Sequence, residues 1–231
     1  MGPKDLGSKP DWDELLEIGI REREQGSVKK GIKLLREALT LCPYHEKRMD
    51  IRNHLGLAYF HGGDYENAVS EWNEVITISN VQSDPDLKAR ASALRNLSRK
   101  ELCNSENDFE EAYIKANQAR ELAIKLGRND LPWFTHGLIS IYYDYSKKYG
   151  RVDKEFLKFL VDCEKIELPK AWKKASKLER GAWFTGLLWD YALLYKKVSR
   201  PILISAISIS RILKMKRREE QLSKRLDEMT Y

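Results

Sequence analysis

The chain has 231 residues, of which 42% are hydrophobic and 33% charged, and its formal net charge is +6. This composition is typical of a soluble globular protein with a packed core, and it excludes a chain that is disordered throughout. The sequence is poor in Pro and Gly, is rich in Leu, Ala, Glu, Lys and Arg, and lacks alternating β-branched stretches, so we expect an all-α protein.

Turn residues and capping residues divide the chain into helices. Gly26, Pro43, the pair Gly62 and Gly63, and Gly127 are the clearest interruptions. The helices that we expect cover about residues 11–26, 27–42, 46–61, 64–79, a segment from 84, then 108–126, 130–148, 153–166, 169–179, 181–197 and 201–228. The connectors are short, which favours antiparallel packing of successive helices.

The stretch NHLGLAYFHGGDYENAVSEW, residues 53–72, indicates one helical hairpin most clearly. Leu55, Gly56 and Tyr59 lie on one face of the first helix, and Ala68 and Trp72 lie on one face of the second. The small residues allow the two backbones to approach, and the large side chains fill the remaining space. The sequence therefore predicts close packing of the two helices along this seam.

The same pattern recurs 37 residues earlier in the chain. Gly19 corresponds to Gly56, Gly31 to Ala68, Leu35 to Trp72, and Ala38 to Val75. A recurrence at this period is typical of stacked helical repeats.

These residues resemble the tetratricopeptide repeat family, whose pattern is W-x2-L-G-x2-Y, then A-x3-F, then P. Residues 49–80 match this pattern at five positions and depart from it at Arg52, Val75 and Asn80; the five matches are Leu55, Gly56, Tyr59, Ala68 and Trp72. Residues 12–45 and about 87–126 match it at fewer positions, namely Gly19, Ala38 and Pro43, and then Ala112, Ala116 and Ala119.

The resemblance implies a right-handed α-α superhelix, a tetratricopeptide-like solenoid. We expect a flexible N-terminus over residues 1–10, three repeat-like hairpins over 11–126, and divergent hairpins that continue the solenoid over 127–200. A long C-terminal capping helix with a basic tail should cover 201–231, because Ile202, Ala206, Ile209 and Leu213 form an apolar stripe. The stripe is broken after Leu213, which predicts a solvated tail.

In the family, the first helices of the hairpins line a concave groove that holds a partner peptide or helix. The resemblance implies the following groove residues here: Asn53, Leu57, Phe60, His61, Leu16, Ile20 and Arg23. Leu57 and Phe60 are the most informative pair, because a helix already buried by other side chains needs no further large apolar groups unless a ligand or an adjoining repeat covers them.

A groove this apolar suits a hydrophobic or amphipathic helix as the partner. The capture of a chaperone C-terminal carboxylate, known from part of the family, is disfavoured because Leu16, Ile20 and His54 occupy the positions of the clamping Lys and Asn. We therefore expect a non-catalytic protein–protein interaction module, such as an adaptor, a scaffold or an assembly subunit.

Catalytic and cofactor motifs are absent from the sequence. It contains no GxxxxGK[ST], GxGxxG, HExxH or GxSxG pattern. His54 and His61 can share a helix face, but no third ligand follows at helical spacing. We expect no enzymatic activity, no cofactor and no metal site.

The alternative function is binding of nucleic acid or an anionic membrane surface through the basic C-terminal third. Residues 170–231 hold 15 Lys and Arg against 6 Asp and Glu. The possible polyanion contacts are Lys214, Lys216, Arg217 and Arg218. The aromatic residues nearby recur at helical spacing, as in Trp183, Leu187, Tyr191 and Leu194, which favours core packing and makes this the second hypothesis.

The sequence favours a cytoplasmic location without a transmembrane segment. Cys42, Cys103 and Cys163 are far apart and form no CxxC pair, which is typical of thiols in a reducing compartment. The first residues contain no apolar signal core. The longest apolar run, residues 201–213, is shorter than the roughly 20 residues that a bilayer span needs.

Overall fold

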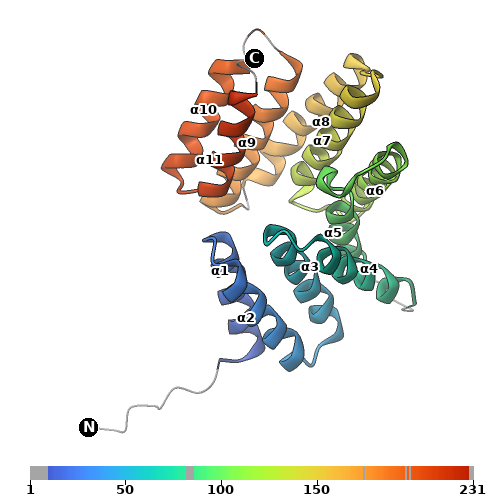
Figure 1. The fold of residues 1–231 in the computed structure, drawn as a ribbon, viewed down its shortest axis with the longest axis vertical. Coiled ribbons are helices and arrows are strands. Elements are labelled where there is room, and N and C mark those ends of the chain that lie inside the picture. The colour runs from blue at the N-terminus through green and yellow to red at the C-terminus, as the bar shows by residue number, and fades with distance from the viewer. Residues whose placement is uncertain (1–9, 82–85, 174, 196, 198, 229–231) are drawn as a thin grey trace. The chain divides into compact units, whose positions relative to one another are not determined.

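The computed structural model describes residues 10–81, 86–173, 175–195, 197 and 199–228, and these residues form helices and no strand (Figure 1). The expected flexible segment at residues 1–10 lies outside the described residues, apart from Pro10. The α-helices are α1 (Trp12–Glu24), α2 (Val28–Leu41), α3 (His45–His61), α4 (Tyr65–Val81), α5 (Leu87–Leu97), α6 (Glu106–Lys125), α7 (Leu131–Tyr149), α8 (Lys154–Trp172), α9 (Lys177–Leu194), α10 (Ser199–Ile212) and α11 (Lys216–Asp227), and a short 3-10 helix covers Lys100–Leu102.

The helices divide into two compact units, Met1–Asn96 and Leu97–Tyr231. In the first unit, α1 packs on α2, α2 on α3, and α3 on α4. In the second unit each helix from α6 to α11 packs on the next one along the chain. This order of neighbours is the one that short connectors predict, and the boundary between the two units falls at the end of α5.

The first two hairpins use the same packing device, as their repeated sequence predicts. A side chain on Gly56 would collide with the indole of Trp72, since an added Cβ would lie 2.8 Å from Cε2 and 2.9 Å from Cδ1. A Cβ on Gly19 would lie 2.9 Å from Cγ of Leu35. Trp72 and Leu35 are fully buried, so each hairpin places a large side chain of its second helix on a glycine of its first.

Capping residues position several helix starts. The Asp11 carboxylate accepts hydrogen bonds from the backbone N–H groups of Asp13 and Glu14, at 3.0 and 2.9 Å. Ser105 and Ser176 each form a capping box with the acidic residue three positions later. Because these contacts satisfy backbone donors that have no partner inside the helix, they fix where α1, α6 and α9 begin.

The C-terminal part differs from the expected single long helix. Residues 199–227 form two helices, α10 and α11, joined by a turn in which Lys214 has a φ of 56°. The N–H of Met215 donates to the carbonyl of Ser210 at 2.8 Å, a bond that closes the end of α10. The apolar stripe continues only to Leu213, whose side chain packs on Gly181 of α9.

The last helix, α11, folds back on the second unit instead of extending as a solvated tail. Leu222 is completely buried with Leu203, Ala206 and Ile207 of α10. The guanidinium groups of Arg218 and Arg225 lie over the rings of Trp133 and Tyr143, at 5.3 and 5.8 Å from the ring centroids. These residues share one face of α11. The sequence KMKRREEQLSKRLDEM therefore contains a short buried face, which is hard to recognise because most of its residues are charged.

Candidate functional site

The predicted groove residues of α1 are mostly turned into the first unit. Leu16 and Arg23 are buried, with exposed fractions of 9% and 6%, whereas Ile20 is half-buried. The Arg23 guanidinium lies 3.4 Å from both the carbonyl oxygen and Nδ1 of His54, and so links α1 to α3. It also forms an ion pair with Glu24.

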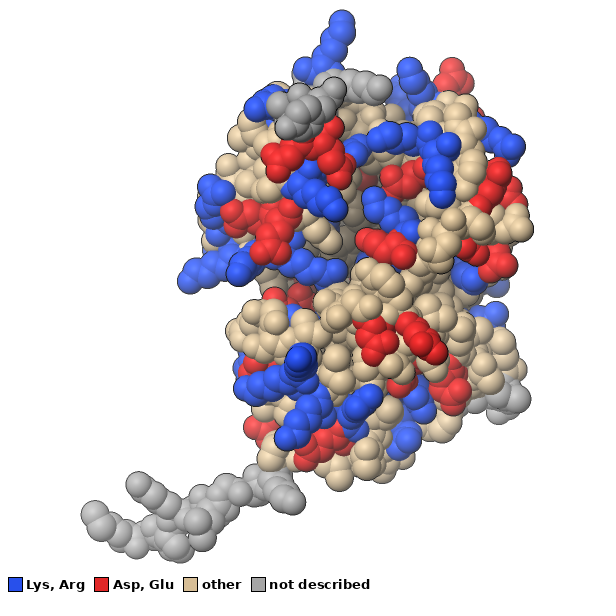
Figure 2. Space-filling view, viewed as in Figure 1, with Lys and Arg blue, Asp and Glu red and all other residues tan. Residues whose placement is uncertain are grey.

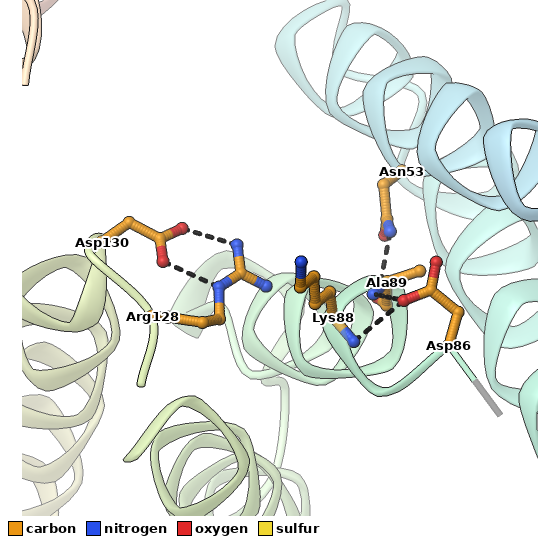
Figure 3. A network of polar contacts seen from close by, with 6 residues as sticks. All are labelled: Asn53, Asp86, Lys88, Ala89, Arg128 and Asp130. Carbon is orange, nitrogen blue, oxygen red and sulfur yellow. Dashed lines mark hydrogen bonds and ion pairs between the residues drawn. The ribbon is translucent and has the colours of Figure 1, made fainter. Parts of the chain in front are cut away.

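Among the predicted groove residues of α3, Asn53 and Phe60 are buried, and Leu57 and His61 are half-buried. Nδ2 of Asn53 donates to the carbonyl of Ala89 in α5 at 3.0 Å, and Figure 3 shows this amide pointing at α5. The ring of Phe60 packs on Tyr65 and Trp72, with centroids 5.2 and 6.1 Å apart. The sequence left two roles open for Leu57 and Phe60, namely contact with a ligand and packing on an adjoining repeat. Phe60 packs inside the repeats.

Two stripes of half-buried and exposed side chains remain on the first helices. On α1 the stripe consists of Asp13, Glu17, Ile20 and Glu24, and on α3 it consists of Asp50, His54, Leu57 and His61. These spacings of four, three and four residues put each set on one helix face. Ile20 and Leu57 occupy equivalent positions of the two hairpins and are half-buried aliphatic residues among polar neighbours.

His54 lies in this stripe and is held as a neutral imidazole. Burial is the largest cause that lowers its pKa to about 4, and the nearby Arg23 charge lowers it further. At neutral pH the α3 stripe therefore carries the Asp50 carboxylate, and the α1 stripe carries three carboxylates around Ile20. The imidazole adds no positive charge to either stripe.

Three of the four predicted polyanion contacts are exposed, and the fourth is not. Lys214, Lys216 and Arg217 are exposed, whereas Arg218 is half-buried against Trp133. Glu219 lies among them and pairs with Arg211 at 2.8 Å. Figure 2 shows Lys and Arg interspersed with Asp and Glu over the face in view. The excess of basic residues in the sequence is thus partly used in internal contacts.

A buried polar cluster in the second unit was not predicted. Its members are His136 of α7, Glu164 of α8 and Asp190 of α9, and one ligand atom from each lies within 4.8 Å of the other two. Nδ1 of His136 and Oδ2 of Asp190 are 2.7 Å apart. Glu164 and Asp190 are 1% and 0% exposed. Carboxyl groups are rarely buried to this extent unless a partner group compensates for the loss of water.

The cluster is electrostatically unusual because its carboxyl groups are removed from water. Burial raises the pKa of Asp190 to about 8, against a hydrogen bond from the Glu164 carboxyl and the charge of Arg218, which both lower it. Burial, and then the neighbouring Asp190, raises the pKa of Glu164 well above its ordinary value. Burial also lowers the pKa of Arg218, to about 10, so this guanidinium stays charged at neutral pH.

The sequence contained one local signal for this cluster. Glu164 interrupts the buried face of α8, which otherwise consists of Leu157, Leu160, Val161, Leu168 and Ala171. An acidic residue at a core position indicates a partner from another helix, but the spacing does not identify that partner. The sequence also offered His54 and His61 as a pair of possible metal ligands. Among the described residues, neither of them belongs to a group of three potential ligands.

Comparison with known proteins agrees with the geometry of the hairpins. No family model matches the chain, and no curated protein matches it. A crystal structure of a Podosopora anserina protein assigned as a kinesin light chain, with nearly identical TPR-like repeats, matches over 87% of this chain and 95% of that one, with 17% identity and a TM-score of 0.53. A second crystal structure of these repeats matches over 88% and 95%, with 17% identity and a TM-score of 0.50.

None of the described helices combines the length and the apolar character that a membrane crossing needs. The packed hairpins, the repeated Gly19–Leu35 and Gly56–Trp72 contacts and the two structural matches lead to the same assignment. The chain has the all-α fold of TPR-like helical repeat structures, as its sequence predicts.

Proposed function

We propose that the chain is a non-catalytic protein-binding module that holds a peptide or helix of another protein along α1 and α3. The observation that carries this proposal is the pair Ile20 and Leu57. They occupy equivalent positions on the first helices of two successive hairpins and are only half-buried, although both hairpins already have filled interiors. Aliphatic side chains that are repeated at equivalent positions and only partly covered by the fold are suited to contact a partner.

The charges around these two residues indicate the chemistry of the partner. Asp13, Glu17 and Glu24 are exposed around Ile20, and Asp50 is exposed on the stripe that contains Leu57. A matching ligand would be an amphipathic helix or extended segment with small apolar side chains flanked by Lys or Arg. Such pairing would contribute mainly to the association rate and to specificity, while the apolar contacts supply affinity.

The proposed location is the cytoplasm. Cys42, Cys103 and Cys163 are all free thiols, which is the usual state in a reducing compartment. Burial is the main cause that raises the pKa of Cys103, to about 11, and also that of Cys163, so neither thiol is activated as a nucleophile. This chemistry agrees with a binding role.

The experiment uses the double variant Ile20→Ser and Leu57→Ser in the full chain. Tagged wild-type and variant proteins are expressed in the source cell at equal levels, and the proteins that they retain are quantified by mass spectrometry. We expect the variant to lose the specifically retained partner at least about tenfold while its melting temperature changes little, because neither side chain is fully buried.

The matched control is the double variant Leu41→Ser and Ile114→Ser, which removes two exposed aliphatic side chains from other helix faces. It should retain the partner like the wild type. Equal retention by the Ile20 and Leu57 variant would refute the proposed surface. If the specifically retained ligand were nucleic acid, and its loss followed Lys214→Glu with Lys216→Glu and Arg217→Glu, the alternative function would replace the proposal.

A further inference from the structure

Three consecutive helices of the second unit contribute one side chain each to a single buried point. His136, Glu164 and Asp190 come from α7, α8 and α9, and their nearest ligand atoms all lie within 4.8 Å of one another. An imidazole nitrogen with two carboxylates is a common donor set for divalent transition metals. Ligand atoms at about 2.0–2.2 Å from one ion lie about 3.3–3.6 Å apart in a tetrahedral site, so binding requires the three side chains to rearrange around the ion.

Two oxygen atoms of the cluster have no hydrogen-bond partner within the described part of the chain. They are Oε2 of Glu164 and Oδ1 of Asp190, and both are fully shielded from solvent. A buried carboxylate oxygen without a partner is costly, and such atoms in native proteins usually have a bound ion, a water or a proton to satisfy them. These atoms therefore require either a proton shared between the carboxyl groups or a bound ion, and this requirement is independent of the spacing.

The charge balance leaves room for a cation. Arg218 of α11 is one positive group whose charge acts on both carboxyl groups, and the charge of His136 also acts on Glu164. One guanidinium compensates one of the two carboxylates. The second is balanced by a proton, held on a carboxyl group or on the His136 imidazole, or by a metal ion that takes the place of that proton. Arg218 is itself held by the Trp133 ring at 5.3 Å, so its position is fixed by packing as well as by charge.

We propose that His136, Glu164 and Asp190 bind one divalent transition-metal ion of the zinc or cobalt class, which ties α7, α8 and α9 together. Binding displaces the proton between Nδ1 of His136 and Oδ2 of Asp190 and releases it to solvent. The His136 side chain is 12% exposed and so forms the accessible edge of the site. The ion acts as a structural cross-link, in contrast to the metal-free protein expected from the sequence.

The first test is direct metal binding by the intact chain. Protein treated with a chelator and then dialysed is titrated with Co²⁺, while visible absorption and proton release are recorded. We expect saturation at one ion per chain, visible absorption bands from a coordinated Co²⁺, and competition by Zn²⁺. Saturating Zn²⁺ should raise the melting temperature by about 2–8 °C. Absence of both the bands and the thermal shift would overturn the proposal.

Variants then locate the ion. Glu164→Gln and Asp190→Asn keep the shape of the side chains but remove a charged donor, and each should weaken Co²⁺ binding at least about tenfold. The matched controls are His61→Gln and Glu111→Gln, which remove a half-buried histidine and an exposed glutamate outside the cluster. Loss of binding in the controls, with none in the cluster variants, would assign the ion to the surface and refute the proposed site.

Discussion

The indole of Trp72 lies directly on the backbone of Gly56. The Trp72 Nε1–H also donates to the carbonyl of Asn53 at 3.3 Å, which fixes the ring across the seam between α3 and α4. A Cβ atom on Gly56 would lie 2.8 Å from Cε2 of the ring, closer than side-chain atoms approach one another. Because the ring is fully buried, it has no space into which to move.

We therefore expect Gly56→Ala to destabilise the first unit by about 1–3 kcal/mol through overpacking. Trp72→Leu should also destabilise, by roughly 3–5 kcal/mol, because it leaves a cavity. In the double variant the smaller side chain at position 72 leaves room for the methyl group at position 56, so its cost should be smaller than the sum of the two. Urea unfolding of all four proteins measures this coupling, and strictly additive costs would show that the two residues do not share the seam.

The second prediction concerns Thr135, which is fully buried in α7. Its hydroxyl accepts from Nε of Arg120 in α6 at 2.9 Å and donates to a carboxylate oxygen of Glu167 in α8. Thr135→Val keeps the shape of the side chain but removes one hydrogen-bond partner each from the Arg120 guanidinium and the Glu167 carboxylate. It should lower the free energy of unfolding by about 1–3 kcal/mol.

Thr40→Val is the matched control, because the exposed Thr40 hydroxyl donates only to the carbonyl of Arg36 in its own helix. Chemical denaturation should show a change within about 0.5 kcal/mol for this control. Equal costs for the two threonine variants would mean that the Arg120–Thr135–Glu167 contacts do not stabilise the second unit.

The third prediction separates the two views of the last helix. A solvated tail would make truncation after Leu213 almost neutral, but the fold-back of α11 predicts a loss of stability. Leu222→Ala alone should cost about 2–5 kcal/mol, because this side chain is completely buried. Leu178→Ala, at a side chain that is 53% exposed, should cost far less. Melting curves that rank the two variants equally would contradict the packing of α11.

The fourth prediction follows from the neutral state of His54. Its pKa in the folded protein is lowered to about 4, whereas an unfolded histidine titrates near 6.5. The unfolded chain therefore binds more protons between these values, and the free energy of unfolding falls as the pH falls through this range. Stability should be intact above about pH 6.5 and should decline toward pH 4.

Urea unfolding followed by tryptophan fluorescence at pH 7 and pH 5 tests this dependence. His54→Gln should reduce the loss of stability between the two pH values by about 1–2 kcal/mol relative to the wild type. His45→Gln, at an exposed position, serves as the matched control and should keep the full loss. An unchanged pH dependence in the His54 variant would show that this imidazole is free to protonate in the folded protein.

The packing of the first two hairpins could be predicted from sequence because it depends on local spacing. Gly19, Leu35, Gly56 and Trp72 lie at fixed distances along amphipathic helices, and the turn residues between the helices set their pairing. The break at Lys214 was missed because a lysine with positive φ has no marker in the sequence. Once α10 ends there, α11 can return and bury Leu222.

The candidate sites could be predicted only in part. Helical spacing put Leu57 and Phe60 forward as a pair, but it could not show that Phe60 is buried, because this burial depends on Tyr65 and Trp72 of the next helix. The cluster of His136, Glu164 and Asp190 depends on the packing of three helices, and no short motif links its members. Long-range juxtapositions of this kind follow from the fold instead of from local pattern.

The most direct test of the proposed function is site-specific photo-cross-linking in the source cell. A photoreactive amino acid is placed at position 20, at position 57 or at the control position 114, and cross-linked adducts are identified after irradiation. The proposal predicts that positions 20 and 57 capture the same protein, through one contiguous segment of that protein, and that position 114 does not. Different adducts at positions 20 and 57, or the same adduct at all three positions, would contradict a shared binding face on α1 and α3.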